Sequence, residues 1–252
     1  MATLYTGGWE LQGVEGVLFD KDGTLIDAHL YWGKIIERRS RALSDHFGLA
    51  ASLFPGLCLS MGYSIEQGRL IPEGPVALVG REKVIAAVLG FLLKHGAHVA
   101  ASEIETLFAE VHKEFRKEAP GFLRVLPGVE KLLKALKGQN VRMAVVTSDA
   151  VANTREVLDS LGLLSFFSVV IGRESTKEPK ESGVPAKIAV SQMGSETGKV
   201  IVIGDAPVDL VMAQQASLKA GVAVSTGQVP YENLCVLTPF ALHGFDELFV
   251  KQ

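Results

Sequence analysis

Phe19-Asp20-Lys21-Asp22-Gly23-Thr24-Leu25 follows directly on a short, mostly apolar run at 14–19. In an extended segment residues i and i+2 point to the same side, so Asp20 and Asp22 can face one cleft while Lys21 points elsewhere. Open α/β sheets bind ligands at the carboxyl ends of their strands, which is where this motif would lie. Taken alone, the motif is equally compatible with a strand-ending turn, so its meaning depends on the rest of the chain.

Four more short apolar runs follow, at 141–146, 167–171, 200–203 and 221–224. They lack polar alternation, which is typical of parallel strands covered on both faces. Amphipathic segments of helical length lie between the later runs, for example at 129–136 and 151–161. This alternation predicts an α/β fold, a doubly wound, Rossmann-like parallel sheet.

A long helical segment separates the first strand from the others. Residues 31–47 and 102–118 carry helical apolar stripes, and Ser102 with Glu105 fits a capping box at the start of the second. The neighbourhood of 68–71 is compatible with a small hairpin. We therefore expect a core made of 1–27 and 121–252, interrupted by a mainly α-helical cap at 28–120.

Composition excludes several classes of protein. Among 252 residues, 25 Lys and Arg stand against 28 Asp and Glu, so the basic excess of a nucleic-acid-binding protein is missing. Cys58 and Cys235 are too few for a disulfide framework or a structural zinc site. The first dozen residues do not resemble a leader, and Gly and Pro interrupt the uncharged stretch 47–65. We expect a cytoplasmic protein without a membrane span.

A second pair of acids occurs after another apolar run. Residues 200–203 lead into Gly204-Asp205-Ala206-Pro207-Val208-Asp209 and then into a predicted helix. Asp205 and Asp209 would join Asp20 and Asp22 at the same edge of the sheet, where four carboxylates repel one another unless a cation neutralises them. Oxygen ligands favour a hard ion, so the expected cofactor is Mg²⁺.

These motifs make the chain similar to the haloacid dehalogenase-like superfamily, in particular to its capped phosphatases of the phosphoglycolate phosphatase-like type. The resemblance rests on 19–25, on Val145-Val146-Thr147-Ser148, on Gly204 to Asp209 and on Leu126-Pro127-Gly128-Val129, where the helix after the cap would begin. The family's lysine motif falls in 177–183. Lys180 precedes Asp205 by 25 positions and is preferred, with Lys177 as the reserve.

The resemblance implies a mechanism and a set of site residues. Asp20 would be the nucleophile that forms an aspartyl-phosphate, and Asp22 would be the general acid and base. Mg²⁺ would bind the Asp20 carboxylate, the Asp22 backbone carbonyl and Asp205, while Asp209 would support it or orient Lys180. The implied residues are, for catalysis, Asp20, Asp22, Thr147 and Lys180; for substrate binding, Thr147, Ser148, Lys180 and Gly23; for the metal, Asp20, Asp22, Asp205 and Asp209.

Several other activities occur in the same superfamily. The dehalogenase branch lacks the second acid, so Asp22 favours phosphoryl chemistry. A phosphonate hydrolase would need a lysine in the cap, and Lys34 is available for that role. A phosphomutase would need one acid and one base from the cap, and the sequence of 28–120 does not single out such a pair. A non-catalytic module that binds a phosphorylated ligand is the rival from another class.

The expected partner is a small phosphorylated metabolite that the cap selects, because the core motifs address only the phosphate. Phosphoglycolate-like, sugar and nucleotide monophosphates all fit. We expect neither nucleic acid nor membrane as a partner, and a monomer or a homodimer.

Overall fold

The computed structural model describes residues 1–72, 74–76 and 81–251, and it divides into two compact units. One unit comprises Met1–Asp27 and Arg124–Gln252, and the other comprises Ala28–Leu123. We expected the inserted segment to end at 120; in this division it ends at Leu123. Each unit is described by itself below.

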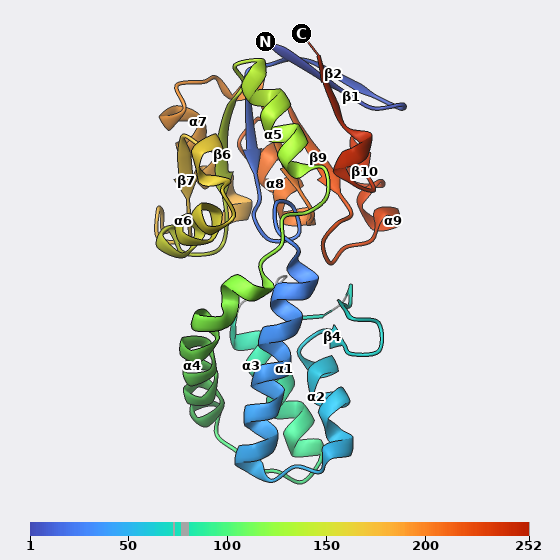
Figure 1. Cartoon of the computed structure of the whole chain (residues 1–252), viewed down its shortest axis with the longest axis vertical. Helices are drawn as coiled ribbons and strands as arrows, with labels where there is room; N and C mark the ends of the chain where they lie inside the picture. Colours follow the sequence, from blue (N-terminus) through green and yellow to red (C-terminus); the bar gives the residue numbers. More distant parts are fainter. Residues whose placement is uncertain (73, 77–80, 252) are drawn as a thin grey trace. The chain divides into compact units, whose positions relative to one another are not determined.

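A six-stranded parallel sheet forms the centre of the first unit, in the order β10-β9-β8-β3-β6-β7 (Figure 1). The strands are β3 (Gly16–Phe19), β6 (Arg142–Val146), β7 (Val169–Ile171), β8 (Val200–Gly204), β9 (Ala220–Val224) and β10 (Ala241–Leu242). All five expected strands are confirmed, and β10 is an additional one. The prediction of a parallel α/β sheet is therefore correct.

The central position of β3 explains how distant motifs meet. Phe19 pairs with Ile203 of β8 on one side and with Val145 of β6 on the other. The segments that follow these three strands consequently begin at one edge of the sheet. This register places the sequence motifs at 19–25, 145–148 and 204–209 beside one another.

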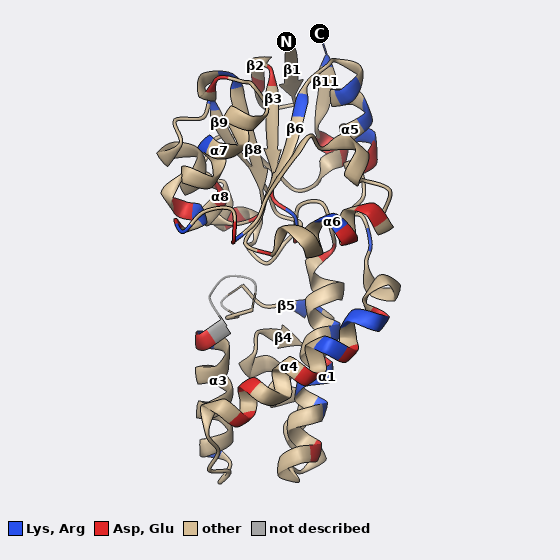
Figure 2. Ribbon diagram, turned by 90° about the vertical axis from the view of Figure 1, so that its left-hand side faces the viewer, with Lys and Arg blue, Asp and Glu red and all other residues tan. Residues whose placement is uncertain are grey.

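Helices cover the sheet, as expected from the alternating pattern. They are α5 (Val129–Gly138), α6 (Val151–Ser160), α7 (Val184–Gln192), α8 (Pro207–Gln215) and the short α9 (Tyr231–Leu234). Buried side chains of α7 and α8 pack against Leu18, Ala144 and Val202 of the strands. Figure 1 draws α5 in front of the sheet and α8 behind it. In Figure 2 few residues of the strands are coloured as charged, whereas α5 has many charged residues. Burial of the sheet requires such a distribution.

A three-stranded antiparallel sheet, which the sequence did not indicate, joins the two ends of the chain. Its order is β11-β1-β2, with β1 at Ala2–Tyr5, β2 at Glu10–Val14 and β11 at Phe249–Lys251. Leu4 is fully buried and pairs with Leu11 on one side and Val250 on the other. The expected single run at 14–19 is therefore divided, because Val14 ends β2 and β3 begins at Gly16.

The inserted unit is mainly helical, as expected. It contains α1 (Ala28–Phe47), α2 (Phe54–Ser60), α3 (Arg81–Lys94) and α4 (Ala101–Glu118), together with the small hairpin of β4 (Tyr63–Ser64) and β5 (Arg69–Leu70). Ile35, Ile36 and Leu43 of α1 are buried. Lys34, the lysine considered for phosphonate chemistry, pairs with Glu37 of its own helix at 2.9 Å.

The start of α4 differs from the prediction. The predicted capping box at Ser102 and Glu105 is wrong, because α4 begins at Ala101 and the Glu103 carboxylate accepts a hydrogen bond from the backbone N–H of Ala100 at 2.9 Å.

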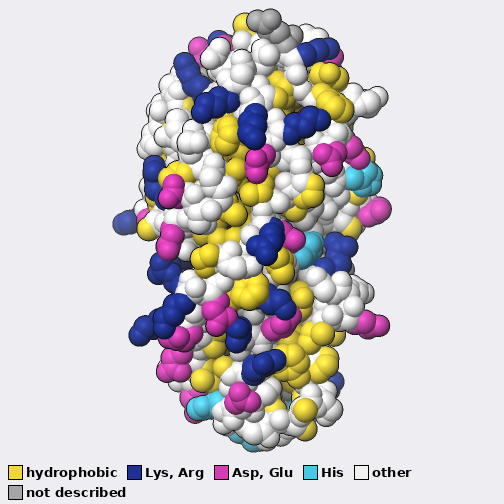
Figure 3. Space-filling model, in the orientation of Figure 1, with side chains coloured by type: hydrophobic (Ala, Val, Ile, Leu, Met, Phe, Trp, Pro, Cys, Tyr) yellow, Lys and Arg dark blue, Asp and Glu magenta, His cyan; other side chains and the backbone are white. Residues whose placement is uncertain are grey.

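Within the described residues, no helix has both the length and the apolar character needed to cross a membrane. On the face drawn in Figure 3, basic and acidic side chains are interspersed, as a formal net charge of −3 suggests.

Candidate active site

The first motif leaves the sheet at Asp20 and turns back at once. The backbone N–H of Asp20 still donates to the Ile203 carbonyl, at 3.0 Å, so this residue is fixed to the neighbouring strand β8. Gly23 has a φ of +85°, and its N–H donates to the Ile26 carbonyl at 2.8 Å. A glycine suits this left-handed position because it has no Cβ. The turn places the side chains of 20–22 at the carboxyl edge of the sheet.

Three carboxylates meet at this edge. Single oxygen atoms of Asp20, Asp205 and Asp209 all lie within 4.8 Å of one another. Asp205 and Asp209 are buried, and the Asp20 side chain is 13% exposed. The sequence-predicted acids of β3 and β8 are thus brought together, whereas the Asp22 carboxylate is not part of this cluster.

Lys180 lies between two of these acids. Its Nζ is 2.6 Å from Oδ1 of Asp20 and 2.6 Å from Oδ1 of Asp209. Burial alone would lower the pKa of Lys180, but attraction to Asp20 and Asp209 outweighs it and raises that pKa above its usual range. The reserve candidate, Lys177, is exposed. The structure therefore brings Lys180, rather than Lys177, to the carboxylate cluster.

Asp205 is enclosed by backbone and by one hydroxyl. The Thr24 hydroxyl donates to Oδ1 at 3.2 Å. A Cβ added to Gly227 would lie 1.7 Å from Oδ2, and a Cβ on Gly23 would lie 2.4 Å from it. Burial, followed by repulsion from Asp20 and Asp209, raises the pKa of Asp205 well above its usual value.

Both oxygens of Asp209 already have partners. Oδ1 pairs with Lys180, and Oδ2 accepts a hydrogen bond from the backbone N–H of Ala206 at 3.1 Å. Burial raises the pKa of Asp209, although the Lys180 ammonium opposes that rise. Of the two roles expected for Asp209, this geometry favours the orientation of Lys180.

The donor set suits a hard divalent cation. Asp20 and Asp205 directly follow adjacent strands, β3 and β8, and each offers carboxylate oxygens as metal ligands. A cation between them would relieve the repulsion that raises the pKa of Asp205. Carboxylates with no nitrogen or sulfur ligand match Mg²⁺ better than zinc or copper. The residues present therefore could hold such an ion.

Asp22 has a different environment from Asp20. Its oxygens contact the Lys21 ammonium, with Nζ 2.8 Å from Oδ2 and 3.0 Å from Oδ1, and its side chain is 17% exposed. Burial raises the pKa of Asp22, and Lys21 opposes the rise. The expectation that Lys21 points away from Asp22 is wrong, because the chain has already left the strand and no longer alternates.

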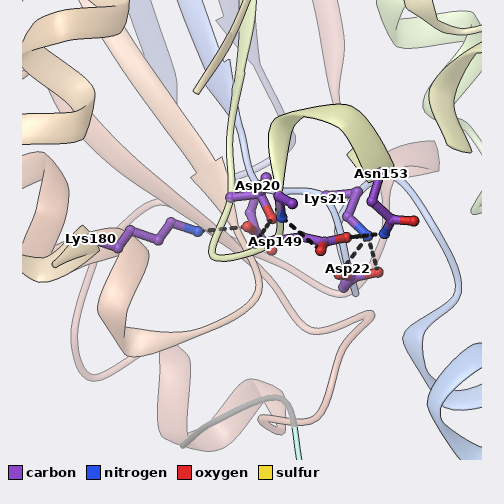
Figure 4. Close-up of polar contacts among 8 residues, drawn as sticks. Asp20, Lys21, Asp22, Asp149, Asn153 and Lys180 are labelled. Atoms are coloured by element: carbon purple, nitrogen blue, oxygen red, sulfur yellow. Dashed lines mark hydrogen bonds and ion pairs between the residues drawn. The ribbon is translucent and has the colours of Figure 1, made fainter. Parts of the chain in front are cut away.

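Asp149 is a site residue that the sequence reading missed. Lys21 Nζ lies 3.2 Å from Asp149 Oδ2, so this ammonium contacts two carboxylates (Figure 4). Although burial alone would raise the pKa of Asp149, Lys21, Asn153 and the Ala150 N–H together lower it. A signal was present, because Asp149 follows the end of β6 at about the position that Asp22 takes after β3.

Thr147, Ser148 and Gly23 complete the expected residues. Thr147 is buried just after β6, and its backbone N–H donates to the Ile171 carbonyl at 2.9 Å. Its hydroxyl oxygen accepts a hydrogen bond from the Asp149 N–H at 3.2 Å. Ser148 is exposed, and the Gly23 carbonyl accepts a hydrogen bond from the Thr226 hydroxyl at 2.6 Å.

Comparison with known proteins points to one family. The model of the haloacid dehalogenase-like hydrolases matches residues 14–217. The phosphoglycolate phosphatase of Neisseria meningitidis is 31% identical over 223 residues, which are 87% of this chain and 84% of that protein. A Dickeya dadantii protein named "Probable phosphatase IndB" is 30% identical over 204 residues, which are 81% of this chain and 78% of that protein.

A solved structure shares the fold. The crystal structure of a predicted phosphoglycolate phosphatase from Haemophilus somnus superposes with a TM-score of 0.72. The match covers 93% of this chain and 96% of that one, at 20% sequence identity. At this identity the likeness concerns the fold alone.

Proposed function

This chain belongs to the haloacid dehalogenase-like hydrolase family, as its motifs indicated, and from that membership we propose that it is a Mg²⁺-dependent phosphatase. The reaction is hydrolysis of a small phosphate monoester through an aspartyl-phosphate on Asp20. One observation carries the proposal: Asp20 directly follows the central strand β3, with the Lys180 ammonium 2.6 Å from its carboxylate and with Asp205 beside it. A nucleophile, a cation and a metal-binding acid are the parts that phosphoryl transfer needs.

In the first step the Asp20 carboxylate attacks the phosphorus atom of the ester. Its Oδ1 is held by Lys180, which fixes the orientation of the carboxylate. A bond forms between an Asp20 oxygen and phosphorus while the ester P–O bond breaks. The leaving oxygen keeps the electron pair and takes a proton from the carboxyl group of Asp22. The raised pKa of Asp22 supports this role, because it favours the protonated form.

In the second step water hydrolyses the intermediate. Asp22, now ionised, takes a proton from water as the water oxygen bonds to phosphorus and the bond to Asp20 breaks. Inorganic phosphate is released, and both carboxyl groups return to their initial states. Lys180 and the Thr147 hydroxyl stabilise the negative charge on the phosphoryl oxygens throughout.

Mg²⁺ would be held by the carboxylates of Asp20 and Asp205 with the Asp22 backbone carbonyl, and it would supply positive charge to the phosphoryl oxygens. Asp209 acts through Lys180 in this proposal. Gly23 and Ser148 are assigned to the substrate phosphate through their backbone positions at the same edge.

The proposed substrate is a small phosphorylated metabolite. Since a relative at 31% identity is named phosphoglycolate phosphatase, 2-phosphoglycolate is the first compound to test. We assign the choice of substrate to the inserted unit, because the residues proposed in the core address only the phosphate and the metal. A cytoplasmic location fits such a substrate.

The test is release of inorganic phosphate by the purified protein with Mg²⁺, over a panel of 2-phosphoglycolate, sugar phosphates and nucleoside monophosphates. Wild type should turn over at least one compound, and addition of EDTA should abolish turnover. Asp20→Asn should be inactive, because an amide is a poor nucleophile. Acid-quenched wild type should carry phosphate bound to Asp20.

Other outcomes separate the alternatives. Binding of phosphate esters without turnover would contradict the phosphatase and favour a binding module. Conversion of a sugar phosphate into its isomer without phosphate release would favour a phosphomutase. An Asp20→Asn variant as active as wild type would overturn the mechanism.

A further inference from the structure

Lys21 is a buried cation within the first motif, and the mechanism above does not use it. Its side chain is only 3% exposed. Its Nζ lies 2.8 Å from Asp22 Oδ2 and 3.2 Å from Asp149 Oδ2. A buried ammonium is costly unless it is paired, so this lysine depends on both carboxylates for its position.

Asp149 is in turn attached to the start of a helix. Its Oδ1 accepts a hydrogen bond from the Ala150 N–H at 2.7 Å, and its Oδ2 accepts one from the Asn153 side-chain amide. Asn153 is in the first turn of α6, so the α6 N-terminus fixes the carboxylate from two directions. Figure 4 shows the resulting series, from Asn153 through Asp149 and Lys21 to Asp22.

This series ends on the group that must transfer a proton. Both Asp22 oxygens contact the Lys21 ammonium, at 2.8 and 3.0 Å. Asp22 lies within the tight turn of residues 20–26 and outside the cluster of three acids, so that cluster does not hold its carboxylate. The orientation of the Asp22 side chain therefore depends on Lys21, and the position of Lys21 depends on Asp149.

We propose that Lys21 and Asp149 are positioning residues that hold the carboxyl group of Asp22 in place for proton transfer to the leaving group. This inference rests on the proposed function. It predicts a defect confined to proton transfer, because the Lys21 ammonium pairs with Asp22 and Asp149, whereas Asp20 pairs with Lys180. Asp149 contacts Thr147 through its backbone N–H, which a side-chain substitution retains. In the first step, which kcat/KM reports, esters whose leaving group needs a proton should react more slowly, and esters with a stable leaving anion should not. The second step, in which Asp22 takes a proton from water, is common to both kinds of ester.

The test compares an alkyl phosphate with 4-nitrophenyl phosphate. Asp149→Asn keeps the shape of the side chain but removes the charge that holds Lys21. A displaced catalytic group costs about 100-fold, so we expect the kcat/KM for the alkyl ester, which reports the first step, to fall by about that factor. The kcat/KM for 4-nitrophenyl phosphate should change less than threefold, because its leaving anion needs no proton. The kcat should fall with both esters wherever hydrolysis of the aspartyl-phosphate limits turnover, because Asp22 is the base in that step. Lys21→Gln should behave in the same way, whereas Lys21→Arg should keep part of the activity.

A double-mutant cycle separates positioning from damage to the fold. In the Asp22→Asn background the acid is absent, so Asp149→Asn should cause no further loss with the alkyl ester. Glu174→Gln is the matched control, because Glu174 also accepts a hydrogen bond at the start of α6, from the Val151 N–H at 2.8 Å. This control should retain wild-type kinetics with both esters.

Equal losses of kcat/KM with both esters, or full additivity with Asp22→Asn, would overturn the inference while leaving the phosphatase intact. Should Asp149→Asn lose its far-UV circular dichroism, Asn153→Ala takes its place, with the same selective defect at smaller size. If wild type hydrolyses no ester, the proposed function fails and this inference fails with it.

Discussion

Lys180 Nζ and Asp20 Oδ1 are 2.6 Å apart, although the two residues are separated by 160 positions in the chain. The pairing arises because Asp20 directly follows the central strand β3, while Lys180 starts the 3₁₀ turn Lys180–Ser182 that precedes α7. Asp209 contacts the same ammonium at 2.6 Å. One lysine thus pairs with the proposed nucleophile, Asp20, and with an acid of helix α8, Asp209.

Replacement of this lysine should impair both activity and stability. We expect Lys180→Met to lower kcat by about 10²–10³-fold, the usual effect of removing one group that stabilises transition-state charge. Breaking a buried pair on one side also costs about 3–5 kcal/mol in the free energy of unfolding. Phosphate-release kinetics and urea unfolding measure the two effects.

The exposed Lys177 provides the control, since Lys177→Met removes the same charge from the same loop. Its unfolding free energy should stay within about 0.5 kcal/mol of wild type. Equal effects of the two substitutions would contradict the role given to Lys180.

The close contact between Gly227 and Asp205 leads to a second prediction. A Cβ at Gly227 would lie 1.7 Å from Asp205 Oδ2, so Gly227→Ala must displace that carboxylate. Overpacking of this kind costs about 1–3 kcal/mol. We expect weaker activation by Mg²⁺. The Mg²⁺ concentration that gives half-maximal activity should rise roughly tenfold for each 1.4 kcal/mol of lost binding free energy.

Titration of activity with Mg²⁺ measures this effect. Gly244→Ala is the matched substitution, because a Cβ there meets nothing within 4 Å. An unchanged Mg²⁺ requirement in Gly227→Ala would show that Asp205 does not bind the ion.

The sequence was sufficient for the parallel sheet and for the meeting of Asp20 with Asp205. Both follow from buried runs with acids at their ends, which is local information. The β1–β2–β11 sheet was missed because β11 is three residues long and pairs with the opposite end of the chain. Such a non-local pairing leaves no short-range signal.

The contact of Lys21 with Asp22 was missed for a different reason. The alternation rule holds for extended backbone, whereas residues 20–26 form a tight turn in which the Lys21 carbonyl accepts the Leu25 N–H at 2.9 Å. Side-chain directions in that turn depend on Gly23 and on contacts from Asp149, a residue far away in the sequence. Identification of such a network needs coordinates.

A fully buried side chain of the central strand β3 leads to a prediction about the free energy of unfolding. Leu18 is fully buried among side chains of α7, α8 and the adjacent strands. We expect Leu18→Ala to lower the free energy of unfolding by about 2–5 kcal/mol through lost burial and a cavity. Val236→Ala, at a position 77% exposed, should change it by less than about 0.5 kcal/mol. Urea denaturation would contradict the assignment if both variants unfolded at the same midpoint.

The raised pKa of Asp205 makes stability without a metal depend on pH. A carboxyl group whose folded pKa exceeds its unfolded value, about 3.9, binds more protons in the folded state. Between the two pKa values the free energy of unfolding therefore falls as pH rises. The proposed Mg²⁺ would bind the ionised form and remove this repulsion, so its stabilising effect should grow with pH through the same window. At a concentration of 100 times Kd the gain is about 2.7 kcal/mol.

Thermal unfolding with and without Mg²⁺ across this pH range tests the linkage. The Mg²⁺-induced increase in Tm should be small in acid, where Asp205 is protonated, and should reach a plateau once the group is ionised. Asp205→Asn should reduce the fall in stability, to which the raised pKa values of Asp22 and Asp209 also contribute, and should abolish the response to Mg²⁺. Asp246→Asn, at an exposed position, should retain both. An increase in Tm that is independent of pH, or one that survives Asp205→Asn, would place the ion away from Asp205.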